Sequence, residues 1–222
     1  MSGEVADGVV RRVADVRRRI AELTDRRVAI VAVTKAQPPG AWSEAALAGC
    51  DALGENYAQE LASKAAVSAP PLPVHFIGRI QSNKVRAVSD VVAVWQSVDR
   101  RSVAAEIARR SPGARVFLQV NATGEPSKGG CAPSDAAALV SEMRDMGLQV
   151  EGAMTLGPTQ PSRPVRLAAF ADLARIADDL GLRERSMGMS DDFEDAVAAG
   201  STMVRLGASL FGPRVRVGDT ER

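Results

Sequence analysis

The sequence predicts an α/β fold: a single (β/α)8 TIM barrel with an extra N-terminal helix. Short β-branched runs alternate eight times with Ala-rich helical stretches between residues 28 and 212. Three of these runs, at 28–33, 91–95 and 116–120, are continuously apolar, which is typical of parallel strands buried on both faces. No Ser/Gly-rich linker divides the chain. We therefore assign residues 1–222 to one domain, with the barrel proper at about 28–212.

The N-terminal helix is predicted by apolar residues that recur at steps of three and four. They are Val9, Val13, Val16, Ile20 and Leu23. The rest of its surface carries five arginines: Arg11, Arg12, Arg17, Arg18 and Arg19. Acidic residues elsewhere in the chain cancel this charge. We therefore interpret the arginines as a solvated helix face rather than as a site for RNA or anionic lipid.

The barrel units follow in order along the chain. The expected strands are residues 28–34, 52–55, 74–78, 91–98, 115–121, 150–156, 184–189 and 202–211. The expected helices are residues 43–50, 57–67, 82–89, about 99–110, 133–146, a helix containing 167–180, and 191–199. A doubly wound open sheet is the main alternative. Eight consecutive units without a switch in connection length favour the closed barrel.

Charge and composition argue against several classes of function. The chain has 28 Lys and Arg against 27 Asp and Glu, so it lacks the basic surplus of a nucleic-acid binder. Its apolar runs are far shorter than the roughly 20 residues of a membrane helix, and no apolar signal-peptide core follows Met1. Two cysteines and one histidine are too few for a zinc site. We expect a cytoplasmic protein without metal, nucleic-acid or membrane partners.

Lys35 is the outstanding candidate for chemistry. Sites of such barrels lie at the carboxyl ends of the strands, and Lys35 directly follows the first predicted strand. An apolar surrounding disfavours the ammonium form, and a neutral amine can attack an aldehyde to form a Schiff base. From position alone, a lysine that extends to solvent remains the alternative.

Glycines and small residues occur at the end of the seventh predicted strand, at 186–190, and in the eighth predicted strand and its exit, at 204–209. Such residues let backbone N–H groups approach an anion, and barrels often bind phosphate after strands seven and eight. Strand one neighbours strand eight in a closed barrel. Together the two features indicate a phosphorylated aldehyde, of which pyridoxal 5′-phosphate is the common one. Asp191 and Asp192 also suit a purely structural helix start with Ser190 as N-cap, so that alternative stays open.

Six ordered blocks of the sequence resemble the pyridoxal phosphate homeostasis proteins. The first block is Val33-Thr34-Lys35 with Pro38, the second is 54–60, and the third is 75–78 followed by 81–84. The other three are 127–130, 187–192 and 200–207. The resemblance implies a barrel similar to the N-terminal domain of alanine racemases, with pyridoxal 5′-phosphate held by Lys35. It also implies that Asn56 lines the ring pocket and that Arg205 faces the ring nitrogen. Ser190, with backbone amides near Gly207 and Ala208, would hold the phosphate.

The resemblance further implies a carrier or buffer in cofactor homeostasis, with possible transfer to apo-enzymes that use pyridoxal phosphate. We assign no catalytic residue. An Arg beside the ring nitrogen leaves that nitrogen unprotonated and weakens the ring as an electron sink. Racemisation needs two acid/base groups on opposite sides of the substrate. Lys35 could be one of them, but the chain has only one tyrosine, Tyr57, and we expect it at the start of the second barrel helix. The racemases take their opposing tyrosine from a C-terminal domain of the partner subunit, for which the residues after Gly212 leave no room. We therefore expect a monomer.

Two other functions stay open. One is a small amino-acid racemase of the same fold, and the other is a barrel that uses Lys35 as an aldolase-type Schiff base without a cofactor. Gln37 stands where many family members have a second lysine, and we interpret Lys128 as a solvated loop lysine. We expect His75 to be a core residue inside the barrel.

Overall fold

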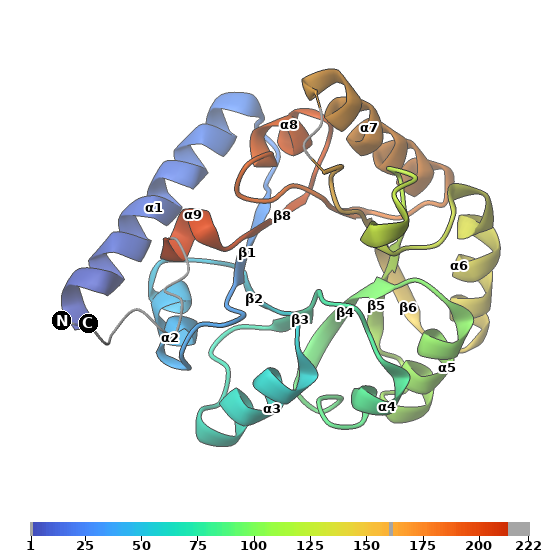
Figure 1. Ribbon diagram of the computed structural model, residues 1–222, viewed down its shortest axis with the longest axis horizontal. Helices are drawn as coiled ribbons and strands as arrows, with labels where there is room; N and C mark the ends of the chain where they lie inside the picture. Colours follow the sequence, from blue (N-terminus) through green and yellow to red (C-terminus); the bar gives the residue numbers. More distant parts are fainter. Residues whose placement is uncertain (1, 160–161, 213–222) are drawn as a thin grey trace.

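The computed structural model describes residues 2–159 and 162–212. Their strands form one closed, all-parallel barrel in sequence order, which confirms the predicted (β/α)8 fold (Figure 1). The strands are β1 (Ala29–Val33), β2 (Ala52–Glu55), β3 (Val74–Phe76), β4 (Val92–Val98), β5 (Arg115–Gln119), β6 (Gln149–Met154), β7 (Glu184–Ser186) and β8 (Met203–Leu206). Because the strands are parallel, their carboxyl ends meet at one rim. The predicted domain also includes residues 1, 160–161 and 213–222, which lie outside the described residues.

The helices surround this barrel (Figure 1). They are α1 (Ser2–Leu23), α2 (Gly40–Leu47), α3 (Ala58–Val67), α4 (Ser82–Val85), α5 (Arg101–Arg110), α6 (Ala136–Asp145), α7 (Arg163–Asp179), α8 (Phe193–Ala198) and α9 (Ala208–Phe211). Two short 3-10 turns, η1 (Pro126–Lys128) and η2 (Pro133–Asp135), precede α6. Helix α1 is the predicted N-terminal helix, and it packs against α2, α8 and α9.

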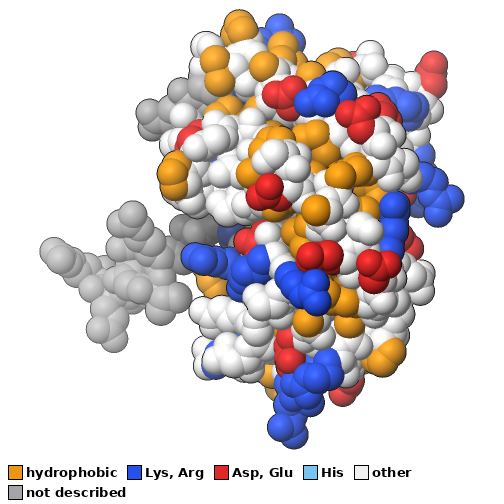
Figure 2. All heavy atoms as spheres, turned by 90° about the vertical axis from the view of Figure 1, so that its right-hand side faces the viewer, with side chains coloured by type: hydrophobic (Ala, Val, Ile, Leu, Met, Phe, Trp, Pro, Cys, Tyr) orange, Lys and Arg blue, Asp and Glu red, His pale blue; other side chains and the backbone are white. Residues whose placement is uncertain are grey.

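The arginines of α1 interact with other groups of the same chain. Arg17 pairs with Asp51 at 2.7 Å, and Arg19 pairs with Glu194 at 2.9 Å. The Nε of Arg12 donates a hydrogen bond to the carbonyl oxygen of Leu210. The charges of α1 therefore connect this helix to neighbouring elements. Elsewhere, on the face that includes α6, basic and acidic side chains are interspersed (Figure 2).

The core has two layers. The larger layer lies between the sheet and the helices and includes the apolar stripe of α1 together with the outward-facing residues of the strands. A smaller cluster draws one residue from each of six strands and fills the barrel interior: Val31, Ala52, Val94, Phe117, Met154 and Met203. This separation follows from the alternation of side chains along each strand. The barrel interior is therefore filled with side chains, and a site can form only at its rim.

Several predicted element boundaries are wrong, for example the helices expected at 43–50 and 82–89 and the strand expected at 184–189. Two of the errors concern the last two barrel units. The eighth strand was expected to span 202–211, but β8 ends at Leu206 and Ala208–Phe211 form helix α9. The apolar residue Leu210 is fully buried there, so the apolar run reflects packing of a helical turn rather than a longer strand. Ser190 is not the N-cap of the following helix. Helix α8 begins at Phe193 with Asp192 in the cap position.

Candidate functional site

Lys35 lies at the carboxyl rim of the barrel, two residues after the end of β1. Strand β1 pairs with β2 on one side and with β8 on the other. The register aligns Val33 with Gly54 and Ala32 with Leu206. Half-buried Lys35 therefore lies in the turn after β1, between β2, which Asn56 follows, and β8, which α9 follows. The structure thus brings three parts of the predicted site together.

Asn56 directly follows β2, and its Oδ1 atom is buried without a hydrogen-bond partner among the described residues. Its backbone is fixed from the side of β3, because a Cβ atom at Gly78 would lie only 2.0 Å from the Asn56 carbonyl oxygen. A glycine is required there by this close approach. An unpartnered buried acceptor of this kind is rare in folded proteins and is often found where a ligand or water binds.

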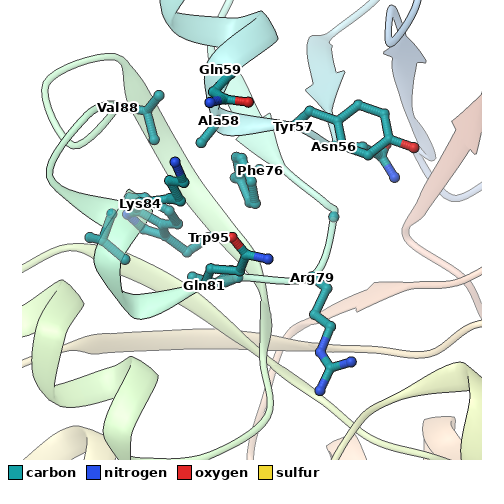
Figure 3. Close-up of a pocket in the computed structure, with 13 residues that line it drawn as sticks. Asn56, Tyr57, Ala58, Gln59, Phe76, Arg79, Gln81, Lys84, Val88 and Trp95 are labelled. Carbon is teal, nitrogen blue, oxygen red and sulfur yellow. The ribbon is translucent and has the colours of Figure 1, made fainter.

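A cavity of about 330 Å³ lies beside Asn56, between α3 and α4 (Figure 3). The rings of Phe76 and Trp95 form part of its wall, with their centroids 5.5 Å apart. Tyr57, at the N-cap of α3, lines the cavity and is 59% exposed. The buried indole Nε1 of Trp95 also lacks a hydrogen-bond partner among the described residues. The cavity therefore lies beside Asn56 and combines apolar walls with a few polar groups.

Arg205 is buried within β8, only 3% exposed, and reaches across the rim toward β7 and β6. Its Nη1 donates hydrogen bonds to the carbonyl oxygen and the hydroxyl of Ser186, both at 2.7 Å. Its Nη2 donates to the carbonyl oxygen of Thr155 at 2.8 Å. Burial lowers the pKa of Arg205 to about 10, while nearby Asp192 acts in the opposite direction. The guanidinium therefore stays charged at neutral pH in one fixed orientation.

A polar chain continues from Arg205 through the barrel interior. The Ser186 hydroxyl donates to Oε1 of Gln96 at 2.7 Å, and Nε2 of Gln96 lies 2.6 Å from Nδ1 of His75. All of these side chains are buried. His75 is thus a hydrogen-bonded core residue, as expected. No sequence pattern indicated Gln96, because a single polar residue within a strand has no local signal for the partner it meets across the barrel. Ser186 lies in the segment 186–190 that the sequence indicated for anion binding, but its contact with Gln96 depends on the closed barrel.

Ser190, Gly207 and Ala208 lie near one another, as the strand order requires. The Ser190 hydroxyl donates to the hydroxyl of Ser209 at 3.1 Å and accepts the Ser209 backbone N–H at 3.2 Å. Ser190 therefore contacts the first turn of α9, the turn that begins at Ala208. Its role in the structure is to join two loops of the rim rather than to cap its own helix.

The two acidic residues after Ser190 differ in environment. Asp191 is exposed, whereas Asp192 accepts the backbone N–H of Met189 at 2.6 Å. Burial raises the pKa of Asp192, although that hydrogen bond and Arg205 act in the opposite direction. A Cβ atom at Gly157 would lie 2.6 Å from Oδ2 of Asp192, so the carboxylate faces the end of β6.

A buried ionic cluster that the sequence did not indicate lies beside the turn that contains Lys35. Lys64 of α3 contacts Glu55 at the end of β2 at 2.8 Å and Glu60 at 2.7 Å. The only local signal was the spacing of Glu60 and Lys64, which places them on one face of a helix. By itself, this spacing is typical of an ion pair on an exposed helix surface. Glu60 and Lys64 join a buried cluster only because α3 packs against the end of β2.

Three further predicted features can be located. Lys128 lies on η1, partly exposed, and Gln37 is partly buried in the turn after Lys35. Cys50 and Cys131 are buried free thiols, and burial raises the pKa of each to about 11. Among the described residues, no group of three His, Cys, Asp or Glu side chains could hold a metal ion.

None of the helices in the described part of the chain combines the length and the apolar character needed to cross a membrane.

Comparison with known proteins agrees with this geometry. The sequence profile of the family described as alanine racemase, N-terminal domain, matches residues 11–215. An alanine racemase from Clostridium difficile 630 shares the fold with a TM-score of 0.75 at 16% identity, over 90% of this chain and 56% of that one. The barrel and its rim thus define the class: alanine-racemase-like N-terminal barrels.

Relatives at higher identity define the family more narrowly. The pyridoxal phosphate homeostasis protein of Pseudomonas aeruginosa is 43% identical over 84% of this chain and 85% of its own length. The protein of the same name from Escherichia coli K12 is 35% identical over 84% of this chain and 86% of its own length. The chain belongs to the pyridoxal phosphate homeostasis protein family.

A solved structure of comparable identity is PipY of Synechococcus elongatus PCC7942, at 32%. Its form without pyridoxal phosphate superimposes with a TM-score of 0.84 and its form with pyridoxal phosphate bound with 0.80. Each comparison covers 92% of this chain and 100% of PipY.

Proposed function

We propose that this protein binds pyridoxal 5′-phosphate through a Schiff base on Lys35 and acts as a carrier or buffer of the cofactor. The grouping of residues at the rim supports the proposal. Lys35 follows β1, Asn56 directly follows β2, and Arg205 lies on β8; β2 and β8 are the two strands that pair with β1. The names of the curated relatives and the pyridoxal phosphate bound to PipY support it.

The residues present fit a phosphorylated aldehyde. When bound, such a cofactor supplies a carbonyl carbon for an amine and a ring that withdraws electrons. Lys35 would provide the amine, and the unpartnered Oδ1 of Asn56 would contact the ring. Ser190 with the backbone amides of Gly207 and Ala208 would hold the phosphate at the start of α9. Arg205 would face the ring nitrogen.

The same residues support binding without catalysis. The charged guanidinium of Arg205 beside the ring nitrogen would keep that nitrogen unprotonated. Tyr57, the one tyrosine of the chain, is mostly exposed at the start of α3. It is therefore poorly protected from water as a second acid/base group opposite Lys35. The curated relatives are likewise named homeostasis proteins rather than enzymes.

The proposal includes a cellular setting. We place the protein in the cytoplasm as a monomer that releases its cofactor to apo-enzymes dependent on pyridoxal phosphate. The reduced state of the two buried thiols is consistent with such a compartment.

Borohydride reduction tests the attachment residue. The protein incubated with pyridoxal phosphate is expected to be yellow and to bleach on reduction. Mass mapping should then find a pyridoxyl-phosphate group on the Lys35 peptide. The Lys35→Ala variant should lose this adduct because it lacks the attacking amine, whereas Lys128→Ala should retain it.

Other results would favour the other functions. An adduct that persists in Lys35→Ala contradicts the assignment of Lys35. A colourless protein that borohydride traps only after addition of a ketone or aldehyde substrate indicates an aldolase-type barrel. Solvent deuterium at Cα of alanine or serine, incorporated over many turnovers, indicates a racemase.

A further inference from the structure

The backbone next to Lys35 is strained. Ala36 has a φ of 58° and is the only non-glycine residue with a positive φ among the described residues. This left-handed conformation is sterically unfavourable for a residue with a side chain. Such strain persists only where surrounding interactions impose it, and it is concentrated at functional sites. The interactions that impose it here can be identified.

Two side chains of α3 hold the residues on either side of Lys35. The Nζ of Lys64 donates a hydrogen bond to the carbonyl oxygen of Thr34 at 2.6 Å. The backbone N–H of Ala36 donates to Oε1 of Glu60 at 2.7 Å. A further bond within the turn, from the N–H of Gln37 to the carbonyl oxygen of Thr34, measures 3.1 Å. The peptide units that flank Lys35 are thus anchored from outside the turn.

Glu55 completes the cluster. Its Oε1 accepts hydrogen bonds from Lys64 Nζ at 2.8 Å, from the Thr34 hydroxyl at 2.7 Å and from the Trp42 indole at 3.1 Å. Glu55 is fully buried and Lys64 is only 4% exposed. The second carboxylate oxygen of Glu55, Oε2, has no hydrogen-bond partner in the described part of the chain. Buried ion pairs of this kind add little stability compared with apolar residues of the same volume. The cluster is better explained by the geometry that it imposes.

We propose that Lys64, Glu60 and Glu55 are positioning residues that fix the turn 34–36, so that the Lys35 amine meets a bound aldehyde in one orientation. The inference rests on the proposed function, in which Lys35 is the attachment residue. Lys64 and Glu60 act through the backbone on either side of Lys35, and Glu55 holds Lys64 in place. A preset orientation of the amine raises the rate of attack because less freedom is lost in the transition state.

The test compares Lys64→Met with the control Asp51→Asn. Asp51 forms a similar cluster at the opposite end of β1, where it binds Arg17, Arg27 and the backbone N–H of Ile30. Both variants lose ion pairs and stability, but only Lys64→Met releases the turn. Bond formation between Lys35 and pyridoxal phosphate, followed by absorption over a range of pH, should slow about tenfold or more in Lys64→Met and remain near wild type in Asp51→Asn.

Glu60 offers a second pair of variants that keeps the test valid if Lys64→Met does not fold. Glu60→Gln retains an oxygen that can accept the Ala36 N–H, whereas Glu60→Leu does not. The side chain of Glu60 is a quarter exposed, so both variants should fold. The rate should be preserved in Glu60→Gln and lost in Glu60→Leu. Wild-type rates in Lys64→Met and Glu60→Leu, or equal losses in Asp51→Asn, would overturn the inference.

A readout without the cofactor separates this inference from the proposed function. Acetic anhydride labels lysine amines, and mass spectrometry reports the labelling of the Lys35 peptide in the free protein. Release of the turn should make Lys35 label several-fold faster in Lys64→Met but not in Asp51→Asn. A wild-type protein that forms no bond with pyridoxal phosphate contradicts the proposed function. Equal labelling in the two variants contradicts the positioning role.

Discussion

At the scale of single residues, the rim depends on side chains whose conformation is imposed by distant partners. Ala36 adopts a left-handed conformation because Glu60 and the Thr34 turn hold it there. Arg205 is oriented by the carbonyl oxygens of Ser186 and Thr155. In both cases a group near the rim is fixed by atoms that belong to another element. Fixed groups of this kind suit a site that must present one face to a ligand.

Ala36 allows a prediction about this strain. Ala36→Gly relieves a steric cost of about 1–2 kcal/mol but adds about 0.4–1 kcal/mol of freedom to the unfolded chain, so the free energy of unfolding should stay the same or rise by up to about 1 kcal/mol. Ala36→Val places a β-branched residue in the left-handed region and should lower it by about 1–2 kcal/mol relative to wild type. Urea unfolding measures both. A valine variant as stable as the wild type would show that the turn is not strained.

At the scale of elements, helix α1 completes the outer layer where β1 and β8 close the barrel. Its residues Val9, Val13, Val16 and Ile20 are at most 5% exposed, and it packs against α2, α8 and α9. Helix α1 therefore covers α8 and α9, the helices before and after β8, beside the part of the rim that starts at Gly207. Loss of its packing is expected to weaken the closure of the barrel between its first and last strands.

Truncation of the buried face of α1 tests this role. Ile20→Ala should lower the free energy of unfolding by about 2–4 kcal/mol, because it removes a buried side chain and leaves a cavity. Val10→Ala is the matched control, since Val10 on the same helix is 41% exposed and should change stability by less than about 0.5 kcal/mol. Thermal or urea unfolding provides the measurement. Equal effects of the two substitutions would contradict a packing role for this face.

At the scale of the whole molecule, the barrel interior joins its apolar cluster to one polar chain. His75, Gln96, Ser186 and Arg205 cross it from β3 to β8. Burial lowers the pKa of His75 from 6.5 to about 4, and Arg115 acts in the same direction. Between these two values the unfolded chain binds a proton that the folded protein does not. The free energy of unfolding therefore falls as the pH falls through this window.

The pH dependence of stability checks this effect. Acidification from about pH 7 to about pH 5 should cost the folded protein about 2 kcal/mol through His75. The variant His75→Gln removes the titrating group and retains polar atoms for Gln96, so its stability should decline less over the same interval. Urea unfolding at both pH values gives the two slopes. Identical slopes would show that His75 is protonated in the folded protein.

The sequence by itself determined the class of fold and the rim at which the candidate residues lie. Alternating apolar runs and helical stretches are local patterns, and in a parallel barrel they suffice to place Lys35, Asn56 and Arg205 at one rim. The resemblance of the sequence blocks likewise indicated the family that the comparisons confirmed.

Only the tertiary structure decided how these residues are held. The segment 207–211 could not be separated by sequence from a longer strand, because so short a run of mostly small and apolar residues has no period that distinguishes a strand from a helical turn. The cluster of Glu55, Glu60 and Lys64 and the contact of Ser190 with α9 join segments that are separate in the chain. Hydrogen bonds and ion pairs across elements depend on packing in three dimensions, and that packing leaves no periodic signal in the sequence.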